Sequence, residues 1–128
     1  GHLLQQCRQL FRHGGLIQTM NTFVKNDDPQ WIDVAPGQRR KIRAYNGEVM
    51  LVEVSFDEGA VGADHTHPHS QISYILSGEF TYNLDGITRT MKPGDSIAVD
   101  GGKVHGLTCI HAGVVLDIFS PMREDFVK

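Results

Sequence analysis

Residues 59–78 read G-A-V-G-A-D-H-T-H-P-H-S-Q-I-S-Y-I-L-S-G and bring His65, His67 and Gln71 close together in the chain. Alternate side chains of a β-strand point to one face, so we expect His65 and His67 to project together from a strand. Imidazoles are common ligands of divalent transition metals, and this pair would supply half of a metal site. Gln71 and His105, which lies on a later expected strand, are candidates for the other half.

The rest of the chain alternates apolar and polar residues between turn sequences. Asn46-Gly47 and Asp85-Gly86 are typical of tight β-hairpins. Strands at spacings of about 8–12 residues predict an all-β sandwich or barrel. In the first strand, Ile42 and Ala44 are expected on one face and Tyr45 on the other. The expected strands cover residues 40–45, 49–56, 71–76, 80–84, 87–91, 96–99, 104–110 and 114–119.

Composition limits the classes of protein that this chain can represent. Its 128 residues suffice for one domain with a core, and its net charge is −3. No basic stripe points to nucleic acid, and no apolar run approaches the roughly 18 residues of a membrane span. Cys7 and Cys109 are too few for a disulfide framework, and we expect Cys109 to be a buried strand residue. Without a recognisable secretory signal, we expect a cytoplasmic location.

Residues 1–19 differ in composition from the rest of the chain, being rich in Gln, Arg and His. Gly1-His2 is also what a cleaved expression tag leaves. We therefore expect residues 1–19 to be a tag- or vector-derived leader and residues 20–128 to form a single domain. The alternative is a native extension in which a short helix has one apolar face, formed by Leu3, Leu4, Cys7, Leu10 and Phe11.

The pattern G59-x5-H65-x-H67-x3-Q71-x6-G78, with Pro93-Gly94-Asp95 and His105 after it, resembles the two motifs of the cupin family. The resemblance covers most of residues 39–119. It implies a double-stranded β-helix, or jelly-roll barrel, with one divalent metal near its mouth. The alternative is a cupin without metal, whose histidines are buried and hydrogen-bonded.

Gln71 stands where the family usually has a Glu ligand. A Gln oxygen is neutral, so the metal would keep its full 2+ charge and act as a stronger Lewis acid toward an anion. Three imidazoles and one oxygen suit Ni, Zn, Fe, Co or Mn, and the sequence does not choose among them. His69 follows Pro68, which breaks the alternation, so we expect it outside the ligand set.

A second group of candidates lies near the C-terminus. Asp117 stands in the apolar run V-V-L-D-I-F, where burying a carboxylate is costly unless the protein uses it. If its face looks into the barrel with Phe119, and Arg123 folds back over the mouth, these groups and a metal would suit a small acid. The alternatives are a surface position for Asp117 and an ion pair of Arg123 with Glu124 or Asp125.

The ending L-D-I-F-S-P-M-R-E-D-F resembles that of the KdgF-type cupins of pectin and alginate breakdown, as do K-I-R-A-Y, V-M-L-V-E-V and H-T-H-P-H-S-Q-I-S-Y-I-L-S-G. Together these segments span nearly all of residues 39–126. The resemblance implies an enzyme that converts 4,5-unsaturated monouronates, released by polysaccharide lyases, to open-chain keto forms. It implies Asp117 as acid/base, Phe119 and Arg123 at the substrate, and a metal held by His65, His67, Gln71 and His105.

Two other functions fit a cupin barrel, because fold alone does not fix function. One is a dioxygenase or another metal-dependent lyase acting on a small organic acid. The other is a non-catalytic sugar-binding cupin, which would tolerate loss of Asp117. By analogy with other cupins we also expect a homodimer, for which residues 22–24 could provide a pairing strand.

Overall fold

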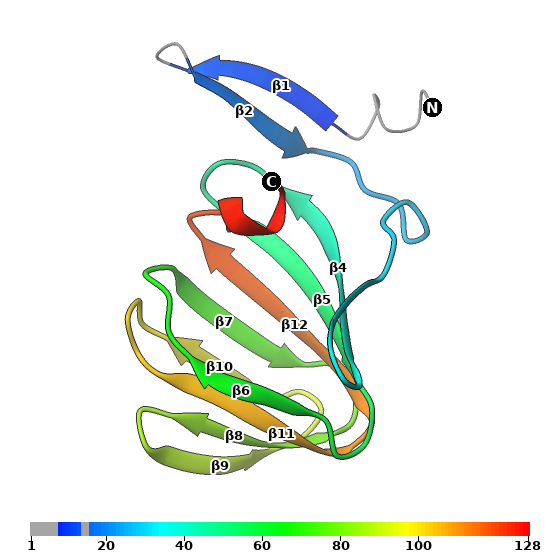
Figure 1. Cartoon of the computed structure of the whole chain (residues 1–128), viewed down its shortest axis with the longest axis vertical. Helices are drawn as coiled ribbons and strands as arrows, with labels where there is room; N and C mark the ends of the chain where they lie inside the picture. The colour runs from blue at the N-terminus through cyan, green and yellow to red at the C-terminus, as the bar shows by residue number, and fades with distance from the viewer. Residues whose placement is uncertain (1–7, 14–15) are drawn as a thin grey trace.

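The computed structural model describes the backbone of residues 8–13 and 16–128 and the side chains of residues 21–128. Its strands form an eight-stranded and a four-stranded antiparallel sheet, which enclose a barrel (Figure 1). None of the helices in this described part is long and apolar enough to cross a membrane. The elements are β1 (Arg8–His13), β2 (Leu16–Asn21), β3 (Ile32–Ala35), β4 (Gln38–Tyr45), β5 (Met50–Phe56), β6 (Val61–His65), β7 (Ser70–Ile75), β8 (Glu79–Leu84), β9 (Ile87–Met91), β10 (Ser96–Val99), β11 (His105–His111), β12 (Gly113–Ser120) and the 3-10 turn η1 (Glu124–Phe126).

Both predicted hairpins are present. Between β4 and β5, the side-chain oxygen of Asn46 accepts hydrogen bonds from the backbone N–H groups of Glu48 and Val49. Between β8 and β9, Asp85 and Gly86 have φ angles of +50° and +83°. Positive φ at both central residues defines the two-residue turn whose twist matches the flanking strands, which explains the Asp-Gly sequence.

The eight strands predicted with bounds from residue 40 onward are all found, each end within two residues of its expected position, and β6 is the strand expected to carry the histidines. The prediction did not include β3, nor the pairing of β1 with β2. Residues 8–13 form a strand where the alternative expected a helix, and Leu3, Leu4 and Cys7 lie outside the described residues. Within the chain, β2 ends at Asn21, and the pairing of residues 22–24 with a second copy stays a prediction. The leader and domain boundary stays a prediction.

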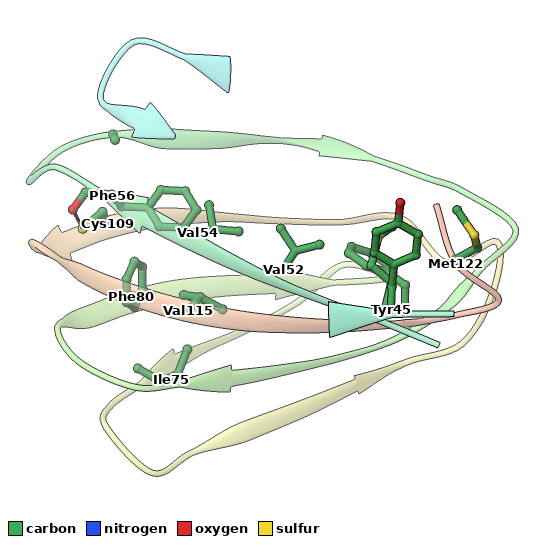
Figure 2. Close-up of a cluster of buried hydrophobic side chains, with 12 residues drawn as sticks. Tyr45, Val52, Val54, Phe56, Ile75, Phe80, Cys109, Val115 and Met122 are labelled. Carbon is green, nitrogen blue, oxygen red and sulfur yellow. Dashed lines mark hydrogen bonds between the residues drawn. The ribbon is translucent and has the colours of Figure 1, made fainter. Parts of the chain in front are cut away.

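Buried apolar side chains fill the barrel from Phe56, Cys109 and Phe80 at one end to Tyr45 and Met122 at the other (Figure 2). The predicted burial of Cys109 is confirmed. The prediction that Tyr45 faces away from Ile42 is wrong. The register shifts between Ile42 and Tyr45, so a bulge turns Tyr45 inward with Ile42.

Strand register brings the C-terminal candidates beside the histidine motif. In the eight-stranded sheet, β12 lies between β5 and β7. Asp117 is paired with Ser73, and Phe119 with Gln71. Directly paired residues project from the same face of a sheet, and Ser73, Gln71 and Phe119 are all buried. The face that carries Asp117 therefore looks into the barrel, as predicted.

Candidate metal and substrate site

Three histidines converge at one end of the barrel. His65 is the last residue of β6 and pairs with His105, the first residue of β11. The prediction that His67 shares a strand with His65 is wrong, because β6 ends at His65 and His67 lies in the loop before β7. The loop nevertheless turns His67 toward the other two. One ring nitrogen from each histidine lies within 4.8 Å of the others, as in a metal site.

Backbone carbonyls fix the tautomer of all three rings. The Nδ1 atoms of His65, His67 and His105 lie 2.9–3.0 Å from carbonyl oxygens of residues two positions away, namely Ala63, His69 and Lys103. A carbonyl can only accept, so each Nδ1 carries the proton and donates it. Each Nε2 is left with a lone pair, which is the form that binds a metal.

Gln71 completes the set of candidate ligands. Its Oε1 lies 2.9 Å from Nε2 of His67 and 3.2 Å from Nε2 of His105. Given the tautomers above, these are acceptor atoms facing one another, an arrangement that a cation would relieve. Two ligands at right angles, each about 2.1 Å from a metal, would lie about 3.0 Å apart. The residues present therefore fit a divalent transition metal.

Burial favours the neutral form of two ligands. His67 and His105 are 8% and 2% exposed. Desolvation lowers the pKa of both rings. Two effects oppose it: the Gln71 oxygen would accept a hydrogen bond from a protonated His67, and His105 donates to the Lys103 carbonyl. Neutral imidazoles at physiological pH keep their Nε2 lone pairs available.

Asp117 is tied to the candidate ligand Gln71 by hydrogen bonds. Its Oδ1 accepts from the Ser73 hydroxyl at 2.6 Å and from the Gln71 amide at 3.1 Å. These bonds orient the amide, so its oxygen faces the histidines. Burial raises the pKa of Asp117 to about 6, even though both hydrogen bonds favour the charged form. A carboxyl group with this pKa can both take up and release a proton near neutral pH.

Ser73 and Tyr82 belong to the same network, although neither was expected from the sequence. Ser73 is 1% exposed, and it accepts a hydrogen bond from Gln71. Since its own proton goes to Asp117, the Tyr82 hydroxyl 3.2 Å away must be a donor to Ser73. The sequence signal for Ser73 was the two-residue periodicity of a β-strand, which places Ser73 on the same face as Gln71. Serines are common in strands that have no functional site, so this signal alone does not single out Ser73.

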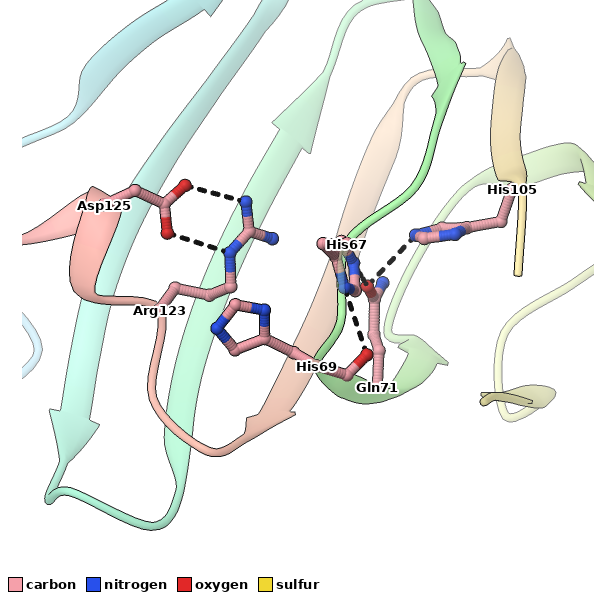
Figure 3. A network of polar contacts seen from close by, with 6 residues as sticks. All are labelled: His67, His69, Gln71, His105, Arg123 and Asp125. Carbon is pink, nitrogen blue, oxygen red and sulfur yellow. Dashed lines mark hydrogen bonds and ion pairs between the residues drawn. The ribbon is translucent and has the colours of Figure 1, made fainter. Parts of the chain in front are cut away.

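Arg123 folds back over the site, as expected, and it also makes the ion pair considered as the alternative. Its guanidinium carbon lies 5.0 Å from the centre of the Phe119 ring, and that ring lies 5.6 Å from the ring of His67. Nε and Nη2 donate to the two oxygens of Asp125 at 3.1 and 2.9 Å (Figure 3). One edge of the guanidinium is thus occupied, and Nη1 remains for another partner.

His69 lies outside the three-histidine cluster, in agreement with the prediction. Its carbonyl anchors His67, and its ring points toward Arg123 in Figure 3. The ring nitrogen Nδ1 is buried and has no hydrogen-bond partner among the described residues. His69 therefore borders the region between the histidine cluster and Arg123.

Comparisons with known proteins place the chain in a family. Residues 52–119 match the cupin domain family. The chain is similar to the pectin degradation protein KdgF of Dickeya dadantii (strain 3937), with 34% identity over 110 residues, which is 84% of this chain and 100% of that protein. The cupin match begins in β5 and ends in β12, so it includes the histidine cluster and Asp117.

Solved structures extend the match to three dimensions. The chain resembles KdgF from Halomonas sp., with a TM-score of 0.79 and 40% identity over 83% of this chain and 98% of that chain. It also resembles an RmlC-like cupin from Shewanella frigidimarina NCIMB 400, with a TM-score of 0.81 and 39% identity over 85% and 97% of the two chains. The predicted all-β jelly roll is confirmed. Since these likenesses span most of both chains in sequence and in structure, the chain belongs to the cupin family and, within it, to the KdgF-type cupins.

Proposed function

We propose that this protein is a metal-dependent enzyme that opens the ring of 4,5-unsaturated monouronates and releases them as linear keto acids. The observation that carries the proposal is Asp117, an acid with a raised pKa, hydrogen-bonded to Gln71 beside three histidines. The similarity to two KdgF proteins supports the same conclusion. Substrates from pectin or from alginate would carry the same reacting group.

His65, His67, Gln71 and His105 would hold one divalent transition metal: Ni, Zn, Fe, Co or Mn. Bound there, the metal would supply Lewis-acid stabilisation of negative charge on substrate oxygens. The neutral Gln71 leaves that charge undiminished, which suits an anionic substrate. The fixed Nδ1–H tautomers keep the ligand atoms directed to one point without reorganisation.

Asp117 would move the proton. As a base it takes the proton of the C1 hydroxyl, while the bond from C1 to the ring oxygen breaks and C1 becomes an aldehyde. The ring oxygen then belongs to an enolate, and Asp117 returns its proton to C4, which yields the keto acid. Proton transfer of this kind contributes roughly 10²–10⁴-fold to a rate. Ser73 and Gln71 would orient the carboxylate through both steps.

Phe119 and Arg123 would position the substrate. Phe119 lies between the histidine cluster and the guanidinium, where a flat ring can form one wall for a sugar. Arg123 would pair with the substrate carboxylate, for which a planar guanidinium is well shaped. The cytoplasmic location and the homodimer remain predictions, and analytical ultracentrifugation of the purified protein would test the homodimer.

Loss of the ultraviolet absorbance of the C4=C5 bond of an unsaturated monouronate measures the proposed reaction. Metal-loaded protein should accelerate this loss, and a chelator should abolish the acceleration. Asp117→Asn should lose most activity with its metal still bound, whereas Asp100→Asn, an exposed site, should not. No acceleration by metal-loaded protein would refute the proposal, and oxygen consumption with iron-loaded protein would then favour a dioxygenase.

A further inference from the structure

Arg40 is a charged side chain on the inner face of the barrel that the proposed chemistry does not use. It lies on β4 opposite Val54, whose side chain is in the core. Paired residues of neighbouring strands project from the same face, so Arg40 points inward. Its guanidinium carbon lies 3.7 Å from the centre of the Phe126 ring, in a cation–π contact.

The hydrogen-bonding groups of Arg40 have no partners among the described side chains. Within residues 21–128 it makes no hydrogen bond and no ion pair, and its Nε is buried. A guanidinium has five N–H donors, and buried polar groups in native proteins are nearly always hydrogen-bonded. Nε is the one guanidinium nitrogen of Arg40 that is buried without a partner among these residues, whereas the two Nη groups are not fully buried, so an acceptor from outside the chain has access to them.

Arg123 contacts the same aromatic ring. Its guanidinium carbon lies 4.2 Å from the centre of the Phe126 ring. Burial and the charge of Arg123 together lower the pKa of Arg40, so the two cations are close enough to repel. Asp125 is the carboxylate beside them, and both of its oxygens already accept from Arg123. Asp125 is thus the one carboxylate in the described part of the chain that is hydrogen-bonded to this pair of arginines.

The pair formed by Arg40 and Arg123 adjoins the histidine cluster. From Arg123 the contacts lead through Phe119 to His67, one of the candidate ligands. An anion held by these arginines would therefore lie close to the proposed metal site. The excess positive charge suits a carboxylate, which accepts several N–H donors in its plane.

We propose that Arg40 and the Nη1 edge of Arg123 together form a receptor for the carboxylate of an acidic sugar, with Asp125 as the positioning residue of Arg123. The inference deepens the proposed function and rests on it for the identity of the natural substrate. Arg40 supplies the selection for an acid over a neutral sugar. Asp125 holds the Nε and Nη2 edge of the Arg123 guanidinium, so the Nη1 edge faces the sugar carboxylate in one fixed orientation. The Arg123 side chain is only 11% exposed, as such a fixed group should be.

The first experiment compares Arg40→Gln with Arg39→Gln in the full metal-loaded chain. Arg39 is the neighbouring residue on β4, but it is exposed and contacts Trp31 and Ser55. The probes are D-galacturonate and neutral D-galactose, whose binding is measured by the rise in melting temperature that each produces. We expect the preference for the acid to fall about tenfold in Arg40→Gln and to be unchanged in Arg39→Gln.

The same variants are then assayed with an unsaturated monouronate. Arg40→Gln should raise KM about tenfold with kcat within about twofold of the wild type, because it affects binding and not the reacting atoms. Its melting temperature without ligand should change little, because the loss of the cation–π contact with Phe126 is offset by relief of the repulsion from Arg123. A merely structural arginine would lower the melting temperature and leave the preference for the acid intact, which would overturn the proposal.

Asp125→Asn tests the positioning role, with Glu124→Gln as the control in the same 3-10 turn. We expect Asp125→Asn to raise KM and Asp125→Glu to restore part of the loss. An unchanged KM in Asp125→Asn would overturn that role. If the wild type binds galacturonate through Arg40 but does not turn over the monouronate, the proposed reaction fails and the receptor stands. If the wild type shows no preference for galacturonate over galactose, the receptor fails.

Discussion

Asp117→Asn should stabilise the metal-free protein at alkaline pH. Burial raises the pKa of Asp117 from 3.8 to about 6 in the folded state. Because the folded pKa exceeds the unfolded one, the folded protein holds the proton more tightly. The contribution of the protonated carboxyl to stability is therefore complete at low pH and is lost as pH rises through about 6.

The magnitude follows from the two pKa values. Their difference of about 2.2 corresponds to about 3 kcal/mol at pH 8, where the carboxylate is charged in both states, and to less than about 1 kcal/mol at pH 4. Asparagine is isosteric and keeps an oxygen for Ser73 and Gln71, but it carries no charge to bury. The variant should therefore exceed the wild type in unfolding free energy by up to about 3 kcal/mol at pH 8.

Urea unfolding of chelator-treated protein, followed by circular dichroism at pH 4 and pH 8, measures this difference. The chelator matters because a bound cation would itself favour the charged carboxylate. Asp100→Asn removes the same charge from an exposed site and corrects for the change in net charge. If Asp117→Asn is no more stable than this control at pH 8, burial of the Asp117 carboxylate does not cost free energy of this size.

Three further predictions concern neighbouring residues. Ser73→Ala should lower the unfolding free energy by roughly 2–4 kcal/mol in urea titrations, because it takes a hydrogen bond from Asp117 and leaves the Tyr82 hydroxyl without an acceptor; an unchanged midpoint would contradict the network. Gly106→Ala should weaken metal retention during dialysis, since its added Cβ would meet the Gly62 carbonyl oxygen at 2.7 Å and push β11 from β6; full metal content would show that the strands adapt. Cys109 should resist a thiol reagent until urea unfolds the protein, because burial raises its pKa and its thiol donates to the His111 carbonyl; rapid labelling of native protein would contradict this.

The alternation of β5 and β12 made most of the barrel predictable, because burial on one face leaves a period of two in the sequence. The same rule failed at His67, because the strand ends before Pro68. The loop, and not the strand, turns the His67 side chain toward the other two histidines. It failed again at Tyr45, because a bulge adds one residue to β4 and reverses the faces beyond it. Pro68 is a local signal for the first irregularity, whereas the bulge before Tyr45 has none.

The candidate ligands were predictable because histidines are rare and their spacing is restrictive. The contacts around them were not, since they depend on which strands become neighbours. Ser73 meets Asp117 only through the pairing of β7 with β12, across 44 residues of chain. Arg40 reaches Phe126 across an even longer stretch. Such contacts depend on which strands pair and in what register, and this cannot be read from a single sequence.

The anchoring of the three imidazoles has a consequence for protein engineering. Each Nδ1–H is held by a carbonyl only two residues away, at Ala63, His69 and Lys103. Each candidate histidine ligand thus belongs to a tripeptide whose own backbone carbonyl fixes the orientation of the ring. A designer who wished to transplant this centre into another β-barrel would need to graft three short peptides in the right relative placement, together with Gln71 and the Ser73 and Asp117 side chains that orient its amide.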